Sequence, residues 1–202
     1  MELDESVFNA LYTYTKALSV ALGYRDLLTR LHSERVLGLS EAIGAACGLP
    51  GKELGTLKIA ATFHDIGKIG IPDHILLKPT QLDAAEWEEI RGHCEIGQKI
   101  LAATELAGSQ QASLVIRHHH EYYNGMGYPD GLAGAEISIC SRIIGIADSY
   151  DAMAVTRSYH NMRTHPEIMA TLQQETGAKH DPEIMRVFRE IIESSKFKAT
   201  KN

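Results

Sequence analysis

The sequence predicts an all-α fold, a helical bundle around a shared polar centre, and three observations support this prediction. Apolar residues recur at helical spacing through most of the 202 residues. Glycine and proline interrupt these stretches where helices would end. Candidate metal ligands, which are histidines and aspartates, follow one another at steps of about 26 to 32 residues. Such a step suits a helix, a turn and part of a second helix, so each unit can deliver a side chain to one centre.

Four helices are predicted most clearly. An apolar stripe over residues 7–21 gives the first, which ends at Gly23. The second is expected over residues 26–47, the third over residues 52–66 and the fourth over residues 138–155. In each of these segments the apolar residues repeat every three to four positions, which is the period of one helix face.

Two of these helices carry candidate ligands. Gly67 suits the position just after a helix C-terminus, so His64 and Asp65 are expected on the last turn of the third helix. Asp148 and Asp151 lie one turn apart on the fourth helix and should project together from one of its faces.

Two segments do not fit a helix. Residues 67–81 contain two prolines and are expected to form an ordered loop. Residues 123–135 contain four glycines and Pro129, and a loop of this size in a compact domain is usually functional. A simple connection between helices is the alternative. The polar residues 196–202 are expected to fray.

Composition narrows the class of protein. With 44% hydrophobic and 23% charged residues the chain is an ordinary globular protein of one domain, or one domain with an extension. It has no apolar stretch long enough to span a membrane and no signal-peptide pattern. The net charge of −6 argues against binding polymeric nucleic acid. Three cysteines without CxxC spacing indicate reduced thiols in a cytoplasmic protein.

Seven residues are the candidate metal ligands: His32, His64, Asp65, His93, His119, His120 and Asp148. A lone histidine is more often a surface or core residue than a ligand. The adjacent pairs weigh against that alternative, because burying several ionisable groups together is costly unless they are paired or bind metal. Seven ligands exceed the four of a tetrahedral zinc and suit two octahedral ions such as iron or manganese. His74, His118 and His165 are expected to be structural or exposed.

These motifs resemble the HD-GYP family, a branch of the HD metal-phosphohydrolase superfamily. The matching strings run through almost the whole chain: LTRLHSERV, FHDIGKIGIPDHILLKP, HCEIG, HHEYYNGMGYPDGLAG, RIIGIADSYDA and GAKHDPEIM. The resemblance implies an HD-domain helical bundle with a dinuclear metal centre. It also implies hydrolysis of the second messenger cyclic di-GMP, to pGpG or on to GMP, by a metal-activated water.

The resemblance also assigns residues. The seven candidate ligands match the metal ligands of the family, with Asp65 in the bridging place. Lys68 matches a lysine that contacts phosphate, where it would neutralise phosphoryl charge or protonate the leaving group. The alternative for Lys68 is a solvated lysine at a helix end. The remaining matches lie near the substrate: Gly127, Tyr128 and Pro129, which form the GYP itself and have been linked to protein partners, and Asp151 and Arg157.

Three departures from the family pattern are visible. Leu28 stands where members with three metals carry a glutamate, which favours two metals here. Asn124 replaces an aspartate found in many members. His160 replaces a lysine or arginine near the substrate, so a titratable group stands in place of a fixed cation.

The sequence therefore predicts a cytoplasmic bacterial phosphodiesterase acting on cyclic di-GMP with two divalent metals, iron or manganese before other transition metals. Residues 1–22 are expected to be the end of a connector helix from a missing regulatory module, and residues 23–202 the HD-GYP domain. The alternative is a catalytically weak receptor for cyclic di-GMP or a partner-binding module. A phosphohydrolase acting on mononucleotides is disfavoured by the GYP loop. A homodimer is considered as well.

Overall fold

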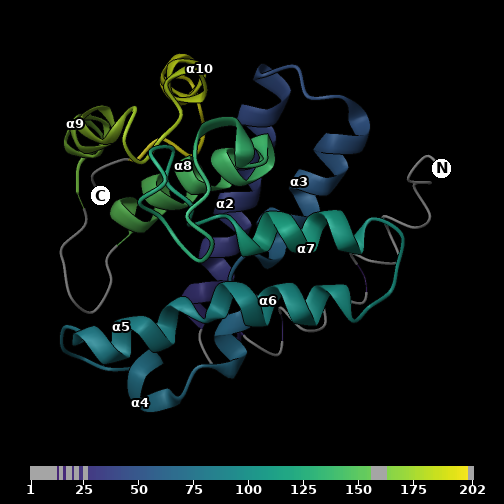
Figure 1. Cartoon of the computed structure of the whole chain (residues 1–202). Coiled ribbons are helices and arrows are strands. Elements are labelled where there is room, and N and C mark those ends of the chain that lie inside the picture. The colour runs from purple at the N-terminus through teal and green to yellow at the C-terminus, as the bar shows by residue number, and fades with distance from the viewer. Residues whose placement is uncertain are drawn as a thin grey trace.

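The computed structural model describes residues 27–155 and 163–199, together with residues 13, 16, 20, 23 and 24. Within these residues the chain is helical and contains no strand, which confirms the predicted all-α class (Figure 1). The elements are α2 (Leu27–Ala46), α3 (Gly51–Phe63), η1 (Ile66–Gly70), α4 (Asp73–Leu76), α5 (Ala84–Arg91), α6 (His93–Ala102), α7 (Ser109–Arg117), η2 (Gly134–Glu136), α8 (Ile139–Ala154), α9 (His165–Glu175) and α10 (Pro182–Ile192).

The hydrophobic core is shared by helices that are distant in the sequence. Helix α2 packs against α3, α8 and α10, while α7 packs against α3 and α6. Ile43, Leu57, Ile116 and Ile143 come from four of these helices and are fully buried. Each such side chain contributes about 1.5–3 kcal/mol by leaving water. This packing fixes the helix ends from which most of the candidate ligands project.

Two predicted helices have the expected bounds to within one residue. The helix expected over residues 26–47 is α2, and the helix expected over residues 138–155 is α8. Ser138 caps α8, since its hydroxyl accepts a hydrogen bond from the Cys140 N–H at 3.3 Å. Most of the predicted N-terminal stripe lies outside the described residues.

The prediction for the end of the third helix is wrong in its details. Helix α3 ends at Phe63, and His64 and Asp65 form the turn that leads into the 3-10 helix η1. Gly67 lies inside η1 rather than after a helix end. A Cβ atom at Gly67 would lie 1.9 Å from the carbonyl oxygen of His93, so the glycine permits η1 to approach α6 closely.

The expectation that the C-terminal residues fray is wrong for residues 196–199. Phe197 packs against the core, and a Cβ atom at Gly38 of α2 would lie 2.2 Å from its ring. The Ala199 N–H donates to the Tyr150 hydroxyl at 2.8 Å. One aromatic residue in a polar segment is therefore enough to anchor it.

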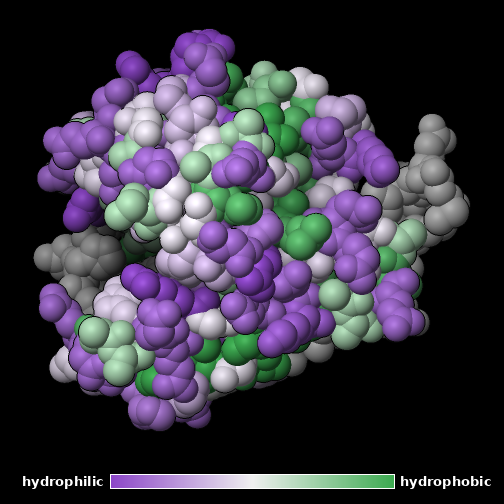
Figure 2. Space-filling view, in the orientation of Figure 1, coloured by the Kyte–Doolittle hydropathy of each residue, from purple (hydrophilic) through white to green (hydrophobic). Residues whose placement is uncertain are grey.

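Figure 2 shows hydrophilic residues over much of the visible face, with apolar residues between them. None of the described helices combines the length and the apolarity needed to cross a membrane.

Candidate metal centre

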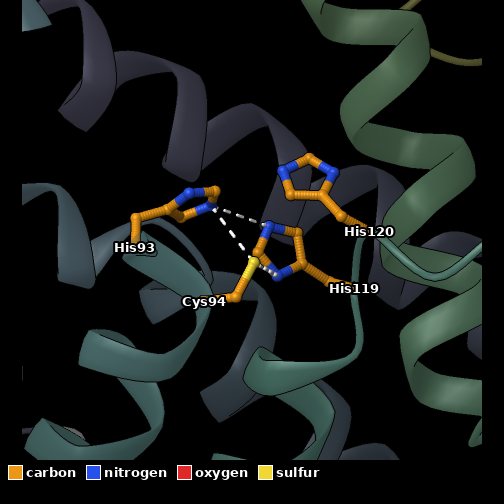
Figure 3. A group of neighbouring side chains, drawn as sticks. All are labelled: His93, Cys94, His119 and His120. Carbon is orange, nitrogen blue, oxygen red and sulfur yellow. Dashed lines mark hydrogen bonds between the residues drawn. The ribbon is translucent and has the colours of Figure 1, made fainter. Parts of the chain in front are cut away.

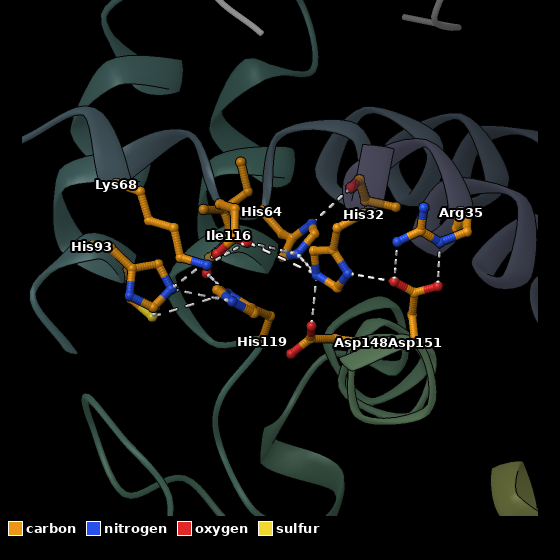
Figure 4. Close-up of polar contacts among 12 residues, drawn as sticks. His32, Arg35, His64, Lys68, His93, Ile116, His119, Asp148 and Asp151 are labelled. Carbon is orange, nitrogen blue, oxygen red and sulfur yellow. Dashed lines mark hydrogen bonds and ion pairs between the residues drawn. The ribbon is translucent and has the colours of Figure 1, made fainter. Parts of the chain in front are cut away.

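The seven predicted ligands lie close together, and Figure 4 labels His32, His64, His93, His119 and Asp148 among them. His32 projects from inside α2, in its second turn, and Asp148 projects from inside α8, whereas the others project from helix ends. His64 and Asp65 follow α3, His93 begins α6, and His119 and His120 follow α7. The histidines His32, His64, His93 and His119 are all buried.

Three of these residues form the first of two groups, called here the His32 group. Its members are His32, His64 and Asp148. The His32 Nε2 atom lies 2.9 Å from Asp148 Oδ1 and 3.3 Å from His64 Nε2. The three donor atoms thus converge on a common point, as the ligands of one ion do.

The second group has four members, His93, Cys94, His119 and His120 (Figure 3), and its three histidines are called here the His93 group. The Nε2 atoms of His93 and His119 are 3.5 Å apart. The ring centroid of His120 lies 5.2 Å from that of His93 and 4.0 Å from that of His119. Three imidazoles from two helix ends therefore face one another across a small space.

Cys94 lies beside the His93 group, where sequence reasoning treated it only as a reduced thiol. Its Sγ atom lies 3.6 Å from His93 Nε2 and 4.0 Å from His119 Nδ1. Burial raises the pKa of the Cys94 thiol far above its usual range, which keeps the sulfur protonated. The side chain therefore packs here as a small neutral group.

Asp65 lies between the two groups. Its Oδ2 atom is 3.5 Å from His64 Nε2 and 3.9 Å from His32 Nε2. Its Oδ1 atom is 3.6 Å from His93 Nε2. One carboxylate oxygen thus faces each group, which is the arrangement that a bridging ligand requires. Lys68, one turn further along the chain, places its Nζ atom 2.6 Å from Asp65 Oδ2.

Helix ends set the tautomers of three histidines. The carbonyls in the last turn of a helix have no intrahelical partner. His64, His93 and His119 each donate Nδ1–H to the carbonyl three residues earlier, of Ala61 at 2.8 Å, Ile90 at 2.7 Å and Ile116 at 2.6 Å. A carbonyl can only accept, so the proton is on Nδ1 and the Nε2 lone pair is free for a metal.

The electrostatics suit metal binding. Burial lowers the pKa of His64, His93 and His119, and it lowers the pKa of His120 to about 3, so these rings are neutral. Metals bind the neutral form of histidine. Burial alone would raise the pKa of Asp65, but Lys68 and the neighbouring histidines hold it well below its usual range.

His32 has the opposite shift. Burial acts to lower its pKa, but hydrogen bonds with Asp148 and Asp151 outweigh this effect and raise the pKa to about 9. Its Nδ1 atom lies 2.7 Å from Asp151 Oδ2. Asp151 also binds Arg35, and its side chain is 5% exposed. The residue expected near the substrate is therefore engaged by two protein side chains.

The side chains of the two groups suit divalent metal ions. Each group offers three nitrogen or oxygen donors, and Asp65 offers one oxygen to each, which gives the donor set that imidazole- and carboxylate-binding divalent ions prefer. Hydrogen bonds on the far side of the ring orient four of the histidines: His32, His64, His93 and His119. The chain thus contains a candidate metal-binding cluster of histidines and aspartates.

The GYP segment borders the His93 group. The Tyr128 ring centroid lies 5.0 Å from that of His120, and the Tyr128 N–H donates to the His120 carbonyl at 3.2 Å. Arg91 lies over the tyrosine ring, with its Cζ atom 5.1 Å from the Tyr128 centroid. A Cβ atom at Gly127 would lie 2.2 Å from the Tyr122 nitrogen, so only glycine fits there. A cis peptide bond joins Tyr128 to Pro129.

Glu121 organises this loop and was missed by sequence reasoning. Its buried carboxylate accepts the backbone N–H groups of Asp130 at 2.6 Å, Gly131 at 3.1 Å and Leu132 at 3.1 Å. The available signal was its place directly after His119-His120 and just before the glycine-rich segment. His118 binds Asp130 at 2.8 Å, which confirms its predicted structural role.

Some predicted residues are not placed. Arg157 and His160 lie outside the described residues, as does the side chain of Leu28. Asn124 is described, and its Oδ1 atom accepts the Met126 N–H at 3.0 Å in a turn of the loop.

Comparisons with known proteins agree with this geometry. A protein-family model described as "HD domain" matches residues 18–184. A cyclic di-GMP phosphodiesterase of Thermotoga maritima is 37% identical over 181 residues, which are 90% of this chain and 49% of that protein. A 3′3′-cGAMP-specific phosphodiesterase 2 of Vibrio cholerae is 36% identical over 173 residues, which are 86% of this chain and 33% of that protein. The chain thus spans half or less of these curated relatives.

A solved structure has the same fold. Bd1817, described as an HDG"Y"P protein from Bdellovibrio bacteriovorus, superposes with a TM-score of 0.66 at 19% identity, covering 92% of this chain and 60% of that chain. This likeness supports the helical bundle predicted from the sequence.

Proposed function

Because the chain belongs to the HD domain family, we propose that it is a metal-dependent phosphodiesterase that hydrolyses cyclic di-GMP to pGpG, GMP or both. The observation that carries this proposal is the position of Asp65 between two groups of histidines. A phosphodiester carries negative charge, and a centre with two cations can bind it and stabilise the further charge that develops during hydrolysis.

The residues that would hold two divalent ions are those of the His32 group, those of the His93 group and the shared Asp65. Such ions would supply Lewis acidity and lower the pKa of a water molecule for attack on phosphorus. Nitrogen and oxygen donors, with the Cys94 thiol kept neutral, favour iron or manganese.

Lys68 is the proposed catalytic cation. An ammonium group has no lone pair and cannot ligate a metal. Its Nζ atom contacts Asp65, and the side chain is 17% exposed, so its charge is only partly screened by water. There it would stabilise charge on the phosphoryl oxygens or protonate the leaving oxygen.

The GYP segment supplies the proposed substrate wall. Tyr128 shields one face of His120, and Arg91 lies against the tyrosine ring. Arg157, His160 and Asp151 remain predicted neighbours of the substrate from the resemblance alone, and the contacts of Asp151 favour a different role for it. Met126, next to Gly127, is 78% exposed, which favours the additional proposal of a protein partner at this loop.

The wider context of the chain belongs to the same proposal. We infer a bacterial cytoplasmic protein, in keeping with its three free cysteines. Residues 1–22 would connect the domain to a regulatory module, and residues 23–202 would form the catalytic domain.

Turnover under anaerobic conditions tests the function. The protein would be loaded with Fe²⁺ or Mn²⁺ and incubated with cyclic di-GMP or 3′3′-cGAMP, and pGpG and GMP would be separated by chromatography. The proposal expects metal-dependent hydrolysis of cyclic di-GMP that is abolished in His64→Ala. Binding of cyclic di-GMP without any turnover by the fully loaded protein would instead identify a receptor.

A further inference from the structure

His32 needs a partner that the other buried ligand histidines do not need. His64, His93 and His119 lie at helix ends and use main-chain carbonyls of the last helical turn before them. His32 lies inside α2, where the carbonyls of the preceding turn are engaged by the helix itself. Its Nδ1–H must therefore find an acceptor on another element.

Helix α8 supplies that acceptor, the carboxylate of Asp151 (Figure 4). Two residues one turn apart on α2, His32 and Arg35, face two residues one turn apart on α8, Asp148 and Asp151. His32 Nδ1 lies 2.7 Å from Asp151 Oδ2. Arg35 binds the same carboxylate in a bidentate manner: Nε donates to Oδ1 at 2.7 Å and Nη2 donates to Oδ2 at 2.9 Å.

The chemistry of this arrangement follows from burial. A carboxylate that accepts Nδ1–H fixes the tautomer of the ring and makes its Nε2 atom a better donor. A carboxylate that is only 5% exposed is costly unless it is paired, and the planar guanidinium of Arg35 satisfies both of its oxygens. Oδ2 of Asp151 then takes part in two hydrogen bonds and Oδ1 in one, so most of the accepting capacity of this carboxylate is used within the protein.

We propose that Arg35 and Asp151 are positioning residues that hold His32 as a ligand and so set the affinity of the ion bound by the His32 group. They do so without contacting that ion or the substrate. This inference rests on the proposed metal centre. It differs from the expectation that Asp151 contacts the substrate, and it adds Arg35, to which no role had been assigned.

The test is equilibrium binding of Mn²⁺ against a competing chelator in wild type, Arg35→Gln, Asp151→Ala and Asp151→Asn. The first two variants should bind one of the two ions about 10- to 100-fold more weakly and the other with unchanged affinity. Asp151→Asn keeps a neutral acceptor for Nδ1–H and should recover part of the loss. At intermediate loading, electron paramagnetic resonance of Arg35→Gln and Asp151→Ala should show an isolated Mn²⁺ ion, where the wild type shows a coupled pair.

A control comes from an ion pair that joins α2 to a different helix. Lys58 on α3 pairs with Glu41 on α2 at 2.7 Å, and neither residue belongs to the metal groups. Lys58→Gln should leave both affinities unchanged. The double variant Arg35→Gln/Asp151→Ala should lose no more affinity than Asp151→Ala alone, because Arg35 acts on His32 through Asp151.

The outcomes separate this inference from the proposed function. Unchanged binding of both ions in Asp151→Ala, or equal weakening of both, would overturn the positioning role. If the wild type binds two ions but hydrolyses no cyclic di-GMP, the proposed phosphodiesterase activity is contradicted. The positioning role would still be supported if the variants lose affinity for only one of the two ions. A wild type that binds fewer than two ions would overturn both.

Discussion

The Lys68 ammonium lies 2.6 Å from the carboxylate of Asp65, the residue that faces both histidine groups. This contact places positive charge at the proposed bridge without adding a ligand. It also accounts for the strongly lowered pKa of Asp65, because the nearby cation opposes the effect of burial.

Replacing Lys68 should separate metal binding from chemistry. In Lys68→Ala the metal content should stay at the wild-type level, because an ammonium group is not a ligand. Turnover of cyclic di-GMP should fall by roughly 10²-fold or more, in line with the loss of one preorganised electrostatic group. Elemental analysis and initial rates on the same preparation measure both quantities. Near-wild-type turnover in a fully loaded variant would refute the role of Lys68.

The stability of the metal-free protein should depend on pH with a defined sign. Burial lowers the pKa of His64, His93, His119 and His120 in the folded chain. These rings therefore contribute stability that is present above the unfolded pKa of about 6.5 and is lost as the pH falls below it. His32, with a folded pKa of about 9, acts in the opposite direction and loses its contribution as the pH rises from about 6.5 through 9.

Burial also lowers the pKa of His180, so five described histidines act in the first direction and His32 acts in the second. The free energy of unfolding should therefore fall clearly from pH 7 to pH 5 and less from pH 7 to pH 9. The carboxylates with lowered pKa values lose their contributions only below about pH 4, outside this range. Urea unfolding in the presence of a chelator measures the profile. Stability that is flat or higher at pH 5 would contradict the assigned neutral rings.

Glu121 should control the GYP loop and leave the metals in place. Glu121→Ala removes the acceptor for three backbone N–H groups, and a buried polar group left without a partner costs about 1–3 kcal/mol. We expect a higher KM for cyclic di-GMP and easier proteolysis within residues 123–135, with unchanged metal content. Glu136→Ala is the matched control, since this exposed residue accepts one hydrogen bond from the same loop, from the Ala133 N–H. Equal effects of the two variants would argue against a special role for Glu121.

Most of the fold could be predicted because periodicity is a local property. The bounds of α2 and α8 follow from the apolar repeat, and the ligand spacing follows from helix length. The end of α3 was predicted incorrectly, because Gly67 was interpreted as a helix-ending residue. Its actual role is to leave room for the carbonyl oxygen of His93, which belongs to a separate element. Phe197 escaped notice for the same reason, since its packing partner lies on α2.

The residues that support the ligands are paired by contacts between positions still farther apart in the sequence. His32 and Asp151 are 119 positions apart, so no pattern within a helix could pair them. The resemblance suggested a substrate contact for Asp151, and only the three-dimensional arrangement revealed Arg35 behind it. The predicted roles of Arg157 and His160 stay predictions, because both residues lie outside the described part of the chain.

The most direct measurement of the central claim is a titration of the metal-free protein with Mn²⁺ or Fe²⁺ under anaerobic conditions, in which bound metal and hydrolysis of cyclic di-GMP are followed together. The geometry of Asp65 between the two groups predicts saturation at two ions per chain, with turnover that rises as the second ion binds. Full turnover at one ion per chain, three fully occupied sites, or no turnover with two ions bound would contradict the account.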